Sequence, residues 1–498
     1  MNIKDMTLEQ KIGQMIMAGF PSDRLDDHIK EIIKKYHIGN IILFARNVKG
    51  KVDLANLNRS IQEYEIENTS IPAFISIDQE GGMVTRIYEG ATFMPGNMAV
   101  AAGGSLEAAY KEGRIAGEEL RALGINVNIA PVLDVNNNPE NPVIGVRSYG
   151  DDPEKVAGFG SNYIRGLENY SMERLQKIEL YPFKEAISAG VDAIMTAHIL
   201  FTAIENRKIP ATLSYKVLTN LLRESMGFKG IIMTDCMEMK AISTYFGTSK
   251  AAVMAVKAGA DIICISHTLS LQIESCNAIK EAVLNGEIAE KRIDESVDRI
   301  INMKRKYNLF ENPYPDMQKV DKMVGCADHR EFAKSISSRS ITLVKDKKRL
   351  IPVKYKNIVS ISTEPAALTG ADDTIIKKET FCKAVKEELG GEAYVMLLDP
   401  DDDAIKNMVE MCKGADVVII GTYNANLNKG QAKLVNKINR INGNTIVVSL
   451  RNPYDIMVFD DVPAYICAYE YTKLSLKSVI DVLKGRQKAV GSLPVKIR

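Results

Sequence analysis

The sequence lacks a surplus of charge of either sign. Its 498 residues include 64 Lys and Arg against 63 Asp and Glu, so the formal net charge is +1. This balance excludes a protein held to nucleic acid by bulk charge, and we expect no nucleic-acid partner. Hydrophobic residues make up 46% and charged residues 26%. These ordinary values exclude a disordered chain and a collagen-like repeat.

Long hydrophobic runs are also missing. Runs such as residues 416–421 have the length of a strand and are far too short to cross a membrane. The first residues, MNIKDM, are not followed by an apolar stretch with a cleavage site, so no signal peptide is expected. We therefore expect no membrane partner.

Cysteine is sparse and scattered. The seven cysteines stand singly, their number is odd, and no Cys-x-x-Cys pair occurs. These features exclude a zinc ribbon and a disulfide framework, and they indicate a reduced, cytoplasmic protein. Gly421 follows an apolar strand, but no G-x-G-x-x-G or P-loop comes after it. Zinc-ligand spacing is absent as well. We expect no metal and no organic cofactor.

The sequence does contain a regular alternation of apolar runs and amphipathic helical stretches over its first 300 or so residues. The runs are nearly continuous, which is typical of parallel strands buried on both faces. Repeated β-then-α units favour a (β/α) barrel or a doubly wound sheet. Strands are predicted at residues 14–20, 38–44, 73–78, 126–133, 192–198, 230–235 and 261–266.

A closed barrel of this type needs about eight strands, and seven are predicted. The irregularity lies after residues 126–133, where two helical stretches, 154–168 and 172–189, follow each other. Alternation predicts a strand between them. The sequence therefore indicates an α/β fold with a (β/α)8-type TIM barrel that is one strand short.

Beyond residue 306 the composition changes, and residues 312–315, NPYP, form a break followed by a polar linker. Alternation then resumes and predicts a second, three-layer α/β sandwich domain. Its strands are expected at residues 340–344, 358–362, 393–398, 416–421, 445–450 and 464–468. The predicted division is a barrel domain over 1–310, a linker over 311–331 and a sandwich domain over 332–498.

Polar residues stand where the predicted barrel strands end. In a (β/α) barrel the carboxyl ends of the strands converge on one mouth, where the chemistry takes place. Each such residue alone is equally well explained as a helix N-cap, but several together favour a mouth. They are Asp78, Glu80, Asp134, His198, Asp235, Ser266 and His267.

Two segments near these ends suit sugar recognition. In SIDQEGG, residues 76–82, paired glycines allow a turn that holds Asp78 toward a ligand, and Arg86 lies just downstream. Adjacent carboxylate and guanidinium groups bind sugar hydroxyls through paired hydrogen bonds. A long Asn- and Pro-rich loop after residues 126–133 places Arg147 over the same mouth. The alternatives are an ordinary strand–loop–helix turn and a structural loop.

Asp235 ends the run IIMTD and is followed three residues later by Glu238. A carboxylate buried at a barrel mouth is in a suitable position to act as a nucleophile. The alternative is an Asp that caps the next helix. His198 ends its own strand in MTAH, and as a lone histidine it is as readily structural as catalytic.

Taken together, these motifs resemble glycoside hydrolase family 3, in particular its β-N-acetylhexosaminidase branch. The resemblance covers MTLEQKIGQ at residues 6–14, the segment 78–82, the loop 131–147, the end of the strand at 234–235, and GSLPV at residues 491–495. It implies a retaining glycosidase that removes terminal β-linked N-acetylglucosamine from muropeptides or chitin-derived fragments, as in peptidoglycan recycling.

The resemblance also implies roles for single residues. Asp235 matches the family nucleophile, which forms a covalent glycosyl-enzyme. Asp78, Arg86 and Arg147 match residues that hold the non-reducing sugar, and we group His198 with the substrate-binding residues. The expected partner is a small carbohydrate, an N-acetylglucosaminide.

One departure from the family is large. The branch carries a Lys-His-Phe-Pro-Gly-His-Gly-Asp-Thr segment, followed shortly by Asp-Ser-His, and the final His, paired with an Asp, is the acid/base. Here residues 166–175, GLENYSMERL, stand where that segment is expected and do not contain it. The missing piece contains one barrel strand, which agrees with the strand count. Met83, where many relatives have Arg, is a smaller departure. Loss of general acid assistance, worth typically 10²–10⁴-fold, leaves Asp235 able to attack an activated glycoside.

Four alternatives stay open. They are a non-catalytic sugar-binding pseudoenzyme, a β-glucosidase, a glycoside phosphorylase of the same family, and the poorly folding product of an internal deletion. For the missing acid, His198 and Glu238 are the nearest replacements by strand-end position.

Overall fold

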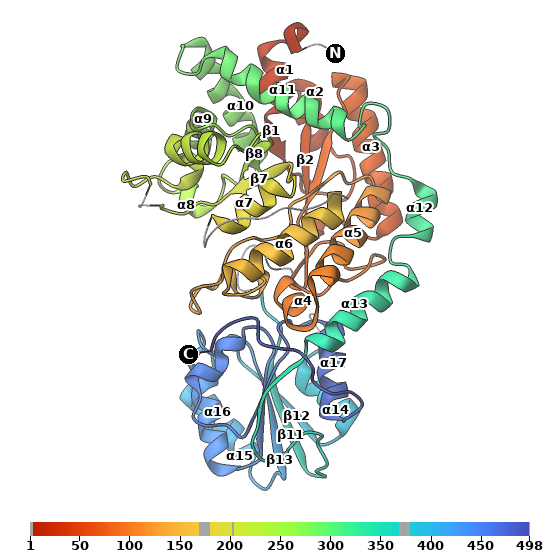
Figure 1. Ribbon diagram of the computed structural model, residues 1–498, viewed down its shortest axis with the longest axis vertical. Helices are drawn as coiled ribbons and strands as arrows, with labels where there is room; N and C mark the ends of the chain where they lie inside the picture. The colour runs from red at the N-terminus through yellow and green to blue at the C-terminus, as the bar shows by residue number, and fades with distance from the viewer. Residues whose placement is uncertain (1–2, 169–179, 202–203, 368–371, 373–378, 498) are drawn as a thin grey trace.

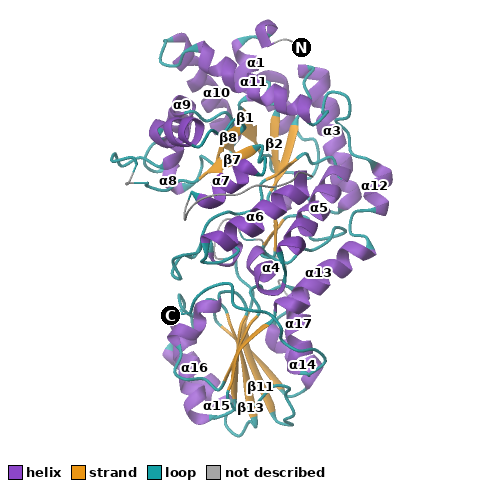
Figure 2. Ribbon diagram, viewed as in Figure 1, coloured by secondary structure: helices purple, strands orange, loops and turns teal. Residues whose placement is uncertain are grey.

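The computed structural model describes residues 3–168, 180–201, 204–367, 372 and 379–497. Two sheets dominate it, one formed by strands between residues 16 and 265 and the other by strands between residues 342 and 467, each flanked by helices (Figure 1). Figure 2 shows the strands of the second sheet as a separate layer between helices, below the first sheet in this view. Within the described ranges no helix combines the length and the apolar character needed to cross a membrane.

The first sheet contains all seven predicted strands, and the prediction of an α/β fold with parallel strands is confirmed. Five of them pair in parallel in the order β6-β3-β2-β1-β9. β8 pairs in parallel with β7 and reaches β9 through a bridge between Met233 and Ile262. The strands are β1 (Ile16–Ala18), β2 (Asn40–Leu43), β3 (Phe74–Ile77), β6 (Val127–Asn128), β7 (Ala193–Thr196), β8 (Ile231–Thr234) and β9 (Ile263–Ile265).

The ladder of seven strands stays open on one side. Among the described residues no pairing joins β6 to β7. As predicted, two helices follow each other in this interval, α6 (Pro153–Glu168) and α7 (Tyr181–Ser188). The first part of the second predicted helix, residues 172–179, lies outside the described residues. The open side is therefore where the sequence count predicts the missing strand.

Amphipathic helices cover the outside of the first sheet because one face of each carries its apolar residues. In α2, the Asp26 carboxylate caps the start by accepting a hydrogen bond from the Ile29 N–H at 3.1 Å, and Ile29, Ile32 and Ile33 are buried. The helices are α1 (Leu8–Gln14), α2 (Asp27–Tyr36), α3 (Lys51–Thr69), α4 (Asn97–Gly103), α5 (Leu106–Ala122), the π-helical η5 (Lys216–Ser225), α8 (Lys240–Ser243), α9 (Thr248–Ala258), α10 (Leu269–Leu284) and α11 (Glu290–Lys306). Short 3-10 turns lie at Ile3–Asp5, Ala45–Asn47, Gly145–Arg147, Ala211–Leu213 and Pro453–Val458.

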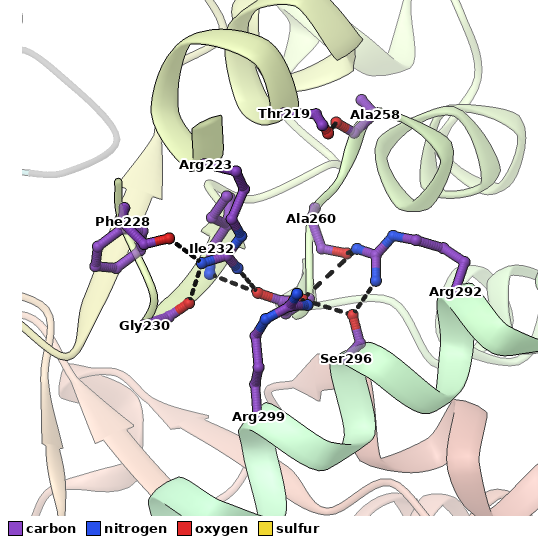
Figure 3. A network of polar contacts seen from close by, with 11 residues as sticks. Thr219, Arg223, Phe228, Gly230, Ile232, Ala258, Ala260, Arg292, Ser296 and Arg299 are labelled. Atoms are coloured by element: carbon purple, nitrogen blue, oxygen red, sulfur yellow. Dashed lines mark hydrogen bonds and ion pairs between the residues drawn. The ribbon is translucent and has the colours of Figure 1, made fainter. Parts of the chain in front are cut away.

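A buried carboxylate fixes α11 to the amino ends of β8 and β9. Asp261 is fully buried and forms ion pairs with Arg223 and, at 3.0 Å, with Arg299. Arg292 lies 3.6 Å away, and the Ser296 hydroxyl donates to the carboxylate at 2.6 Å. The side chains of the three arginines converge on this point from η5 and α11 (Figure 3). One carboxylate thus holds two helices against the sheet.

Asp261→Ala should lower the free energy of unfolding by about 3–5 kcal/mol. Removal of one partner from a buried ion-pair network leaves the other charges uncompensated. Thermal melting followed by circular dichroism measures the change. Asp298→Ala, at an exposed aspartate of α11, is the control and should change stability by less than about 0.5 kcal/mol. Equal effects of the two substitutions would contradict the assignment.

A short hairpin follows β3 where a simple turn was expected. β4 (Gln79–Gly81) and β5 (Val84–Thr85) pair antiparallel. Gly81 and Gly82 have φ values of 91° and 56°, a region that favours glycine. The hairpin reverses the chain, so Arg86 returns to the end of β3. The paired glycines therefore allow the chain to form this hairpin.

The second sheet is a three-layer sandwich, as predicted. Its order is β10-β15-β14-β13-β11-β12, with β10 antiparallel and the others parallel. Helices α14 and α17 cover one face, and α15 and α16 the other (Figure 1). The strands are β10 (Thr342–Asp346), β11 (Ile358–Thr363), β12 (Glu392–Met396), β13 (Val417–Thr422), β14 (Thr445–Ser449) and β15 (Ala464–Cys467). The helices are α14 (Phe381–Leu389), α15 (Asp402–Met411), α16 (Lys429–Ile441) and α17 (Lys473–Leu483).

Two helices connect the sheets, α12 (Met317–Lys322) and α13 (Ala327–Ser340). The domain division at residues 310 and 331 stays a prediction, and α13 runs through its second boundary. α13 extends to Ser340, so β10 begins two residues later than predicted. α13 packs on α4 of the first part.

A buried glutamate of the second part contacts the hairpin region of the first. The Glu470 carboxylate accepts hydrogen bonds from the Gly96 N–H at 2.9 Å and from the Thr472 hydroxyl at 3.0 Å. A Cβ at Gly82 would lie 2.8 Å from Glu470 Oε2, so this close approach requires a glycine there. Burial raises the pKa of Glu470 to about 7.

The stability of the chain should therefore fall between pH 5 and pH 8 more than that of Glu470→Gln. In the unfolded chain this carboxyl loses its proton near pH 4.3, whereas in the folded chain it holds it to about pH 7. The folded state binds the proton more tightly, so its advantage is full at low pH and declines by up to about 3 kcal/mol as pH rises. Urea unfolding of both proteins at the two pH values measures this. An identical pH dependence in both would contradict it.

Candidate active site

Asp235, the predicted nucleophile, follows β8 directly and is half-buried. Its Oδ1 accepts a hydrogen bond from the Cys236 N–H at 2.6 Å. Burial raises the pKa of the Asp235 carboxyl, against the lowering effect of that N–H. The charges of His198 and Arg147 also lower the pKa, and the charge of Asp78 raises it. Four predicted site residues from different segments therefore lie within electrostatic reach of one another.

The helix-cap alternative for Asp235 is wrong. α8, the next helix, has Met239 at its N-cap position, and Asp235 makes no hydrogen bond to it. Glu238 instead binds the two residues that precede α10. Its carboxylate accepts hydrogen bonds from the His267 N–H at 2.7 Å and from the Thr268 N–H and hydroxyl at 3.2 and 2.7 Å. Glu238 is therefore held in a structural role, which disfavours it as a replacement acid.

Asp78 and Arg86 lie side by side at the end of β3. Arg86 Nη2 is 3.0 Å from Asp78 Oδ2. The hairpin is held in register by Gln79, whose side-chain oxygen accepts the backbone N–H of Arg86 at 3.0 Å and of Ile87 at 3.2 Å. Among the described residues, the ion pair with Arg86 engages Asp78 through Oδ2 and not through Oδ1.

Arg147 is held by Glu80, a pairing that the sequence analysis missed. The guanidinium forms two parallel hydrogen bonds to the carboxylate, from Nε at 2.9 Å and from Nη2 at 2.7 Å. Burial raises the pKa of Glu80, and Arg147 opposes this rise. Although burial alone would lower it, the pKa of Arg147 is raised by Glu80, and Asp78 and Asp134 add to this. The position of Glu80, two residues after Asp78, was the available signal.

His198 uses both ring nitrogens within the protein. Nε2 lies 3.0 Å from the Cys236 carbonyl oxygen, to which it donates, and Nδ1 lies 2.9 Å from Thr212 Oγ1. The ring therefore holds the backbone next to Asp235. This geometry favours a positioning role over protonation of a leaving group, and the substrate-binding role of His198 stays a prediction.

An aromatic side wall completes the mouth, and the sequence analysis did not identify it. Phe44 follows β2, and its ring lies 4.3 Å from the Arg46 guanidinium and 5.1 Å from the His267 ring. Arg86 lies 5.7 Å from the same ring. Arg46 donates to the Ser266 carbonyl at 3.1 Å, which ties the ends of β2 and β9 together. The only available signal was the place of Phe44 at a strand end.

The described ranges contain no group of three or more His, Cys, Asp or Glu side chains arranged to hold a metal ion. The site is thus a cluster of carboxylates and guanidinium groups at strand ends. Such a cluster can bind hydroxyl groups and offer a carboxylate to an electrophilic carbon.

The sequence model of the Glycosyl hydrolase family 3 N terminal domain matches residues 7–173 and again residues 168–303. The two stretches together span more than half of the chain and overlap at residues 168–173. The absence of the family segment from residues 166–175 stays a prediction.

Individual relatives resemble the chain over nearly its whole length. A solved glycoside hydrolase family 3 beta-N-acetylglucosaminidase from Paenibacillus sp. str. FPU-7 has a TM-score of 0.90 and 37% identity, over 99% of both chains. Beta-hexosaminidase A of Pseudoalteromonas piscicida is 28% identical over 99% of this chain and 97% of its own length. A Beta-N-acetylglucosaminidase/beta-glucosidase of Cellulomonas fimi is 24% identical over 99% of this chain and 94% of its own length. On the extent of these matches, the chain belongs to glycosyl hydrolase family 3.

Proposed function

We propose that the chain is a retaining glycoside hydrolase that removes terminal β-linked N-acetylglucosamine. The observation that carries the proposal is the place of Asp235, half-buried at the end of β8 within reach of Asp78, Arg147 and His198. The names of the Paenibacillus and Pseudoalteromonas relatives support the substrate class.

In the first step, an Asp235 carboxylate oxygen attacks the anomeric carbon of the sugar. The bond from that carbon to the leaving oxygen breaks, and its electron pair leaves with the aglycone. The departing aglycone takes a proton from solvent. Water then attacks the same carbon, releases the Asp235 carboxylate and gives up its proton to solvent, so two inversions retain the configuration. The Cys236 N–H holds the carboxylate in position at 2.6 Å.

Asp78, Arg86 and Arg147 bind the sugar in this proposal. Asp78 Oδ1 accepts a hydroxyl of the ring, because Oδ2 is occupied by Arg86. Arg147 is pre-positioned by its two hydrogen bonds to Glu80, so less side-chain entropy is lost when sugar binds.

The test is release of a good phenol leaving group from aryl β-N-acetylglucosaminide and from the matched aryl β-glucoside, each with and without phosphate. Preference for the N-acetylglucosaminide without phosphate supports the proposal. Preference for the glucoside identifies a β-glucosidase, and release that requires phosphate identifies a phosphorylase. No release from protein that melts cooperatively overturns hydrolysis.

A sugar-binding pseudoenzyme is the second candidate. It is favoured by the absence of the family acid/base segment from residues 166–175. Titration calorimetry with N-acetylglucosamine tests it. Saturable binding without turnover of any aryl glycoside supports it, and no binding counts against it.

We also propose that the chain works in the cytoplasm on muropeptides or chitin-derived fragments, with peptidoglycan recycling as its context. All seven cysteines lie in the described ranges, and none forms a disulfide. Free, mostly buried thiols are typical of a reducing compartment.

A further inference from the structure

The tip of the hairpin that follows β3 is buried in the second part of the chain, the part that contains β10 to β15. Met83 stands between β4 and β5 and is 7% exposed. It belongs to a hydrophobic core whose other buried members all come from residues 341–483. The hairpin that brings Arg86 back to Asp78 is therefore anchored in the core of the second part.

A buried carboxylate that follows β15 also holds this hairpin. Glu470 Oε2 accepts the Gly96 N–H at 2.9 Å and would lie 2.8 Å from a Cβ at Gly82. Tyr469, the preceding residue, has a φ of 65°, a left-handed conformation that residues other than glycine rarely adopt. Its hydroxyl donates to Thr342 Oγ1 at 2.7 Å, which ties the residue to β10. Strained residues of this kind persist where the surrounding structure holds them, and they cluster at functional sites.

The loop that carries Arg147 contacts the second part as well. Val146 is 5% exposed and belongs to a hydrophobic core in which most members come from residues 359–495. Earlier in the loop, the Pro139 carbonyl accepts a hydrogen bond from the Asn426 side-chain nitrogen at 2.9 Å. Both segments that supply predicted sugar-binding residues are therefore anchored in the second part.

The groups that position Asp235 belong instead to the first part. The Asp235 carboxylate accepts the Cys236 N–H at 2.6 Å, and the His198 ring donates to the Cys236 carbonyl at 3.0 Å. The other nitrogen of that ring lies 2.9 Å from Thr212 Oγ1. The nucleophile and the sugar-binding residues therefore have separate supports.

We propose that the second part acts as a positioning element for the sugar-binding half of the candidate active site, with Met83 and Glu470 as its positioning residues. This inference rests on the proposed function, which assigns Asp78, Arg86 and Arg147 to the sugar. The contacts keep these three side chains in one arrangement before the sugar arrives, so less conformational entropy is lost on binding. Loss of a contact weakens sugar binding and leaves the nucleophile in place.

Met83→Ala and Glu470→Ala test the proposal in the full chain. Each should raise KM for an aryl β-N-acetylglucosaminide, and Kd for N-acetylglucosamine in titration calorimetry, by about fivefold or more. The value of kcat should stay within about threefold, because loss of uniform binding raises KM and leaves kcat unchanged. Met83→Leu, which fills the same apolar space, should restore binding. Glu470→Gln should restore it too, because its amide oxygen still accepts the Gly96 N–H.

Leu350→Ala is the matched control, because Leu350 is 2% exposed in the same core as Met83 but at the opposite end of the second sheet. It follows β10, whose Asp346 pairs with Ala464 at the start of β15, whereas Glu470 follows the end of β15. We expect the control to lower the melting temperature as Met83→Ala does and to leave KM and Kd unchanged. An equal rise of KM in the control would indicate a general loss of stability and overturn the proposal.

Hydrogen exchange followed by mass spectrometry separates this proposal from the proposed function. The backbone amides of residues 79–86 should exchange faster in Met83→Ala than in the original chain, and those of residues 231–236 should not. This result does not depend on turnover, so absence of phenol release from the original chain overturns hydrolysis alone. Unchanged exchange at residues 79–86, or unchanged KM and Kd in variants that melt cooperatively, overturns the positioning role.

If neither alanine variant melts cooperatively, Asn426→Ala replaces them, because Asn426 is half-buried and loses only its side-chain contacts. Exchange at residues 136–147 is then the measurement. Faster exchange there, with a weaker Kd for N-acetylglucosamine, supports the positioning role, and unchanged exchange overturns it.

Discussion

Asp235→Asn should lower the rate of phenol release from an activated aryl β-N-acetylglucosaminide by a factor of about 10⁴ or more. The amide nitrogen and oxygen cannot form the covalent glycosyl-enzyme, and loss of a covalent nucleophile acts on this scale. A good leaving group departs without a proton, so this substrate tests the nucleophile alone. Phenol release followed by absorbance measures the rate, and a trapped glycosyl-peptide containing Asp235, seen by mass spectrometry, identifies the attacking group.

The matched control is Glu238→Gln, three residues further along the same loop. Its carboxylate binds His267 and Thr268, ahead of α10, and does not face the sugar in our proposal. We expect its turnover to stay within a few-fold of the original chain. If Asp235→Asn kept its turnover, or if both substitutions reduced it equally, Asp235 would not be the nucleophile.

Natural disaccharides should be hydrolysed poorly, and restoring the family segment should raise that rate 10²–10⁴-fold. The leaving oxygen of a sugar needs a proton, and general acid assistance is worth this factor. The design inserts the strand and loop containing Lys-His-Phe-Pro-Gly-His-Gly-Asp-Thr and the following Asp-Ser-His between residues 169 and 170. Hydrolysis of di-N-acetylchitobiose measures the gain, and the activated aryl glycoside should gain little.

The control for this design is the same insert with its final His, that of Asp-Ser-His, replaced by Ala. It restores the strand between β6 and β7 without the acid. Rapid hydrolysis of the disaccharide by the original chain would show that another group supplies the proton. An equal gain from both inserts would show that the strand, and not the acid, limits activity.

Azide gives an independent check that the general acid/base is missing. It is a small anion that needs no general base, so it should speed the breakdown of the glycosyl-enzyme on an activated substrate. Formation of the β-glycosyl azide, detected by NMR, is the expected product. Unchanged turnover and no azide product would indicate that a base is present after all.

The strands were predictable because parallel strands buried on both faces are continuous apolar runs. All seven runs of the first sheet were identified, but their ends were not. The run at residues 126–133 supplies only the two residues Val127–Asn128 to β6. A strand exists only where a neighbour pairs with it, and β6 has a described neighbour on one side only.

The site was predictable where its parts are close in sequence. Asp78 and Arg86 are eight residues apart, and the hairpin between them brings them within 3.0 Å. The pair of Glu80 with Arg147 spans 67 residues. No local pattern selects such a partner, because the contact depends on the course of a long loop.

The sequence by itself determined the α/β class, the seven strand runs, the family and the candidate nucleophile, since each depends on local apolar pattern or on a contiguous motif. Tertiary structure alone decided that Glu80 positions Arg147, that His198 holds the backbone beside Asp235, and that Glu238 binds the backbone of His267. It also decided that, among the described residues, the ladder stays open between β6 and β7. These features join groups far apart in the chain, and only the packing of the elements brings such groups within hydrogen-bonding distance.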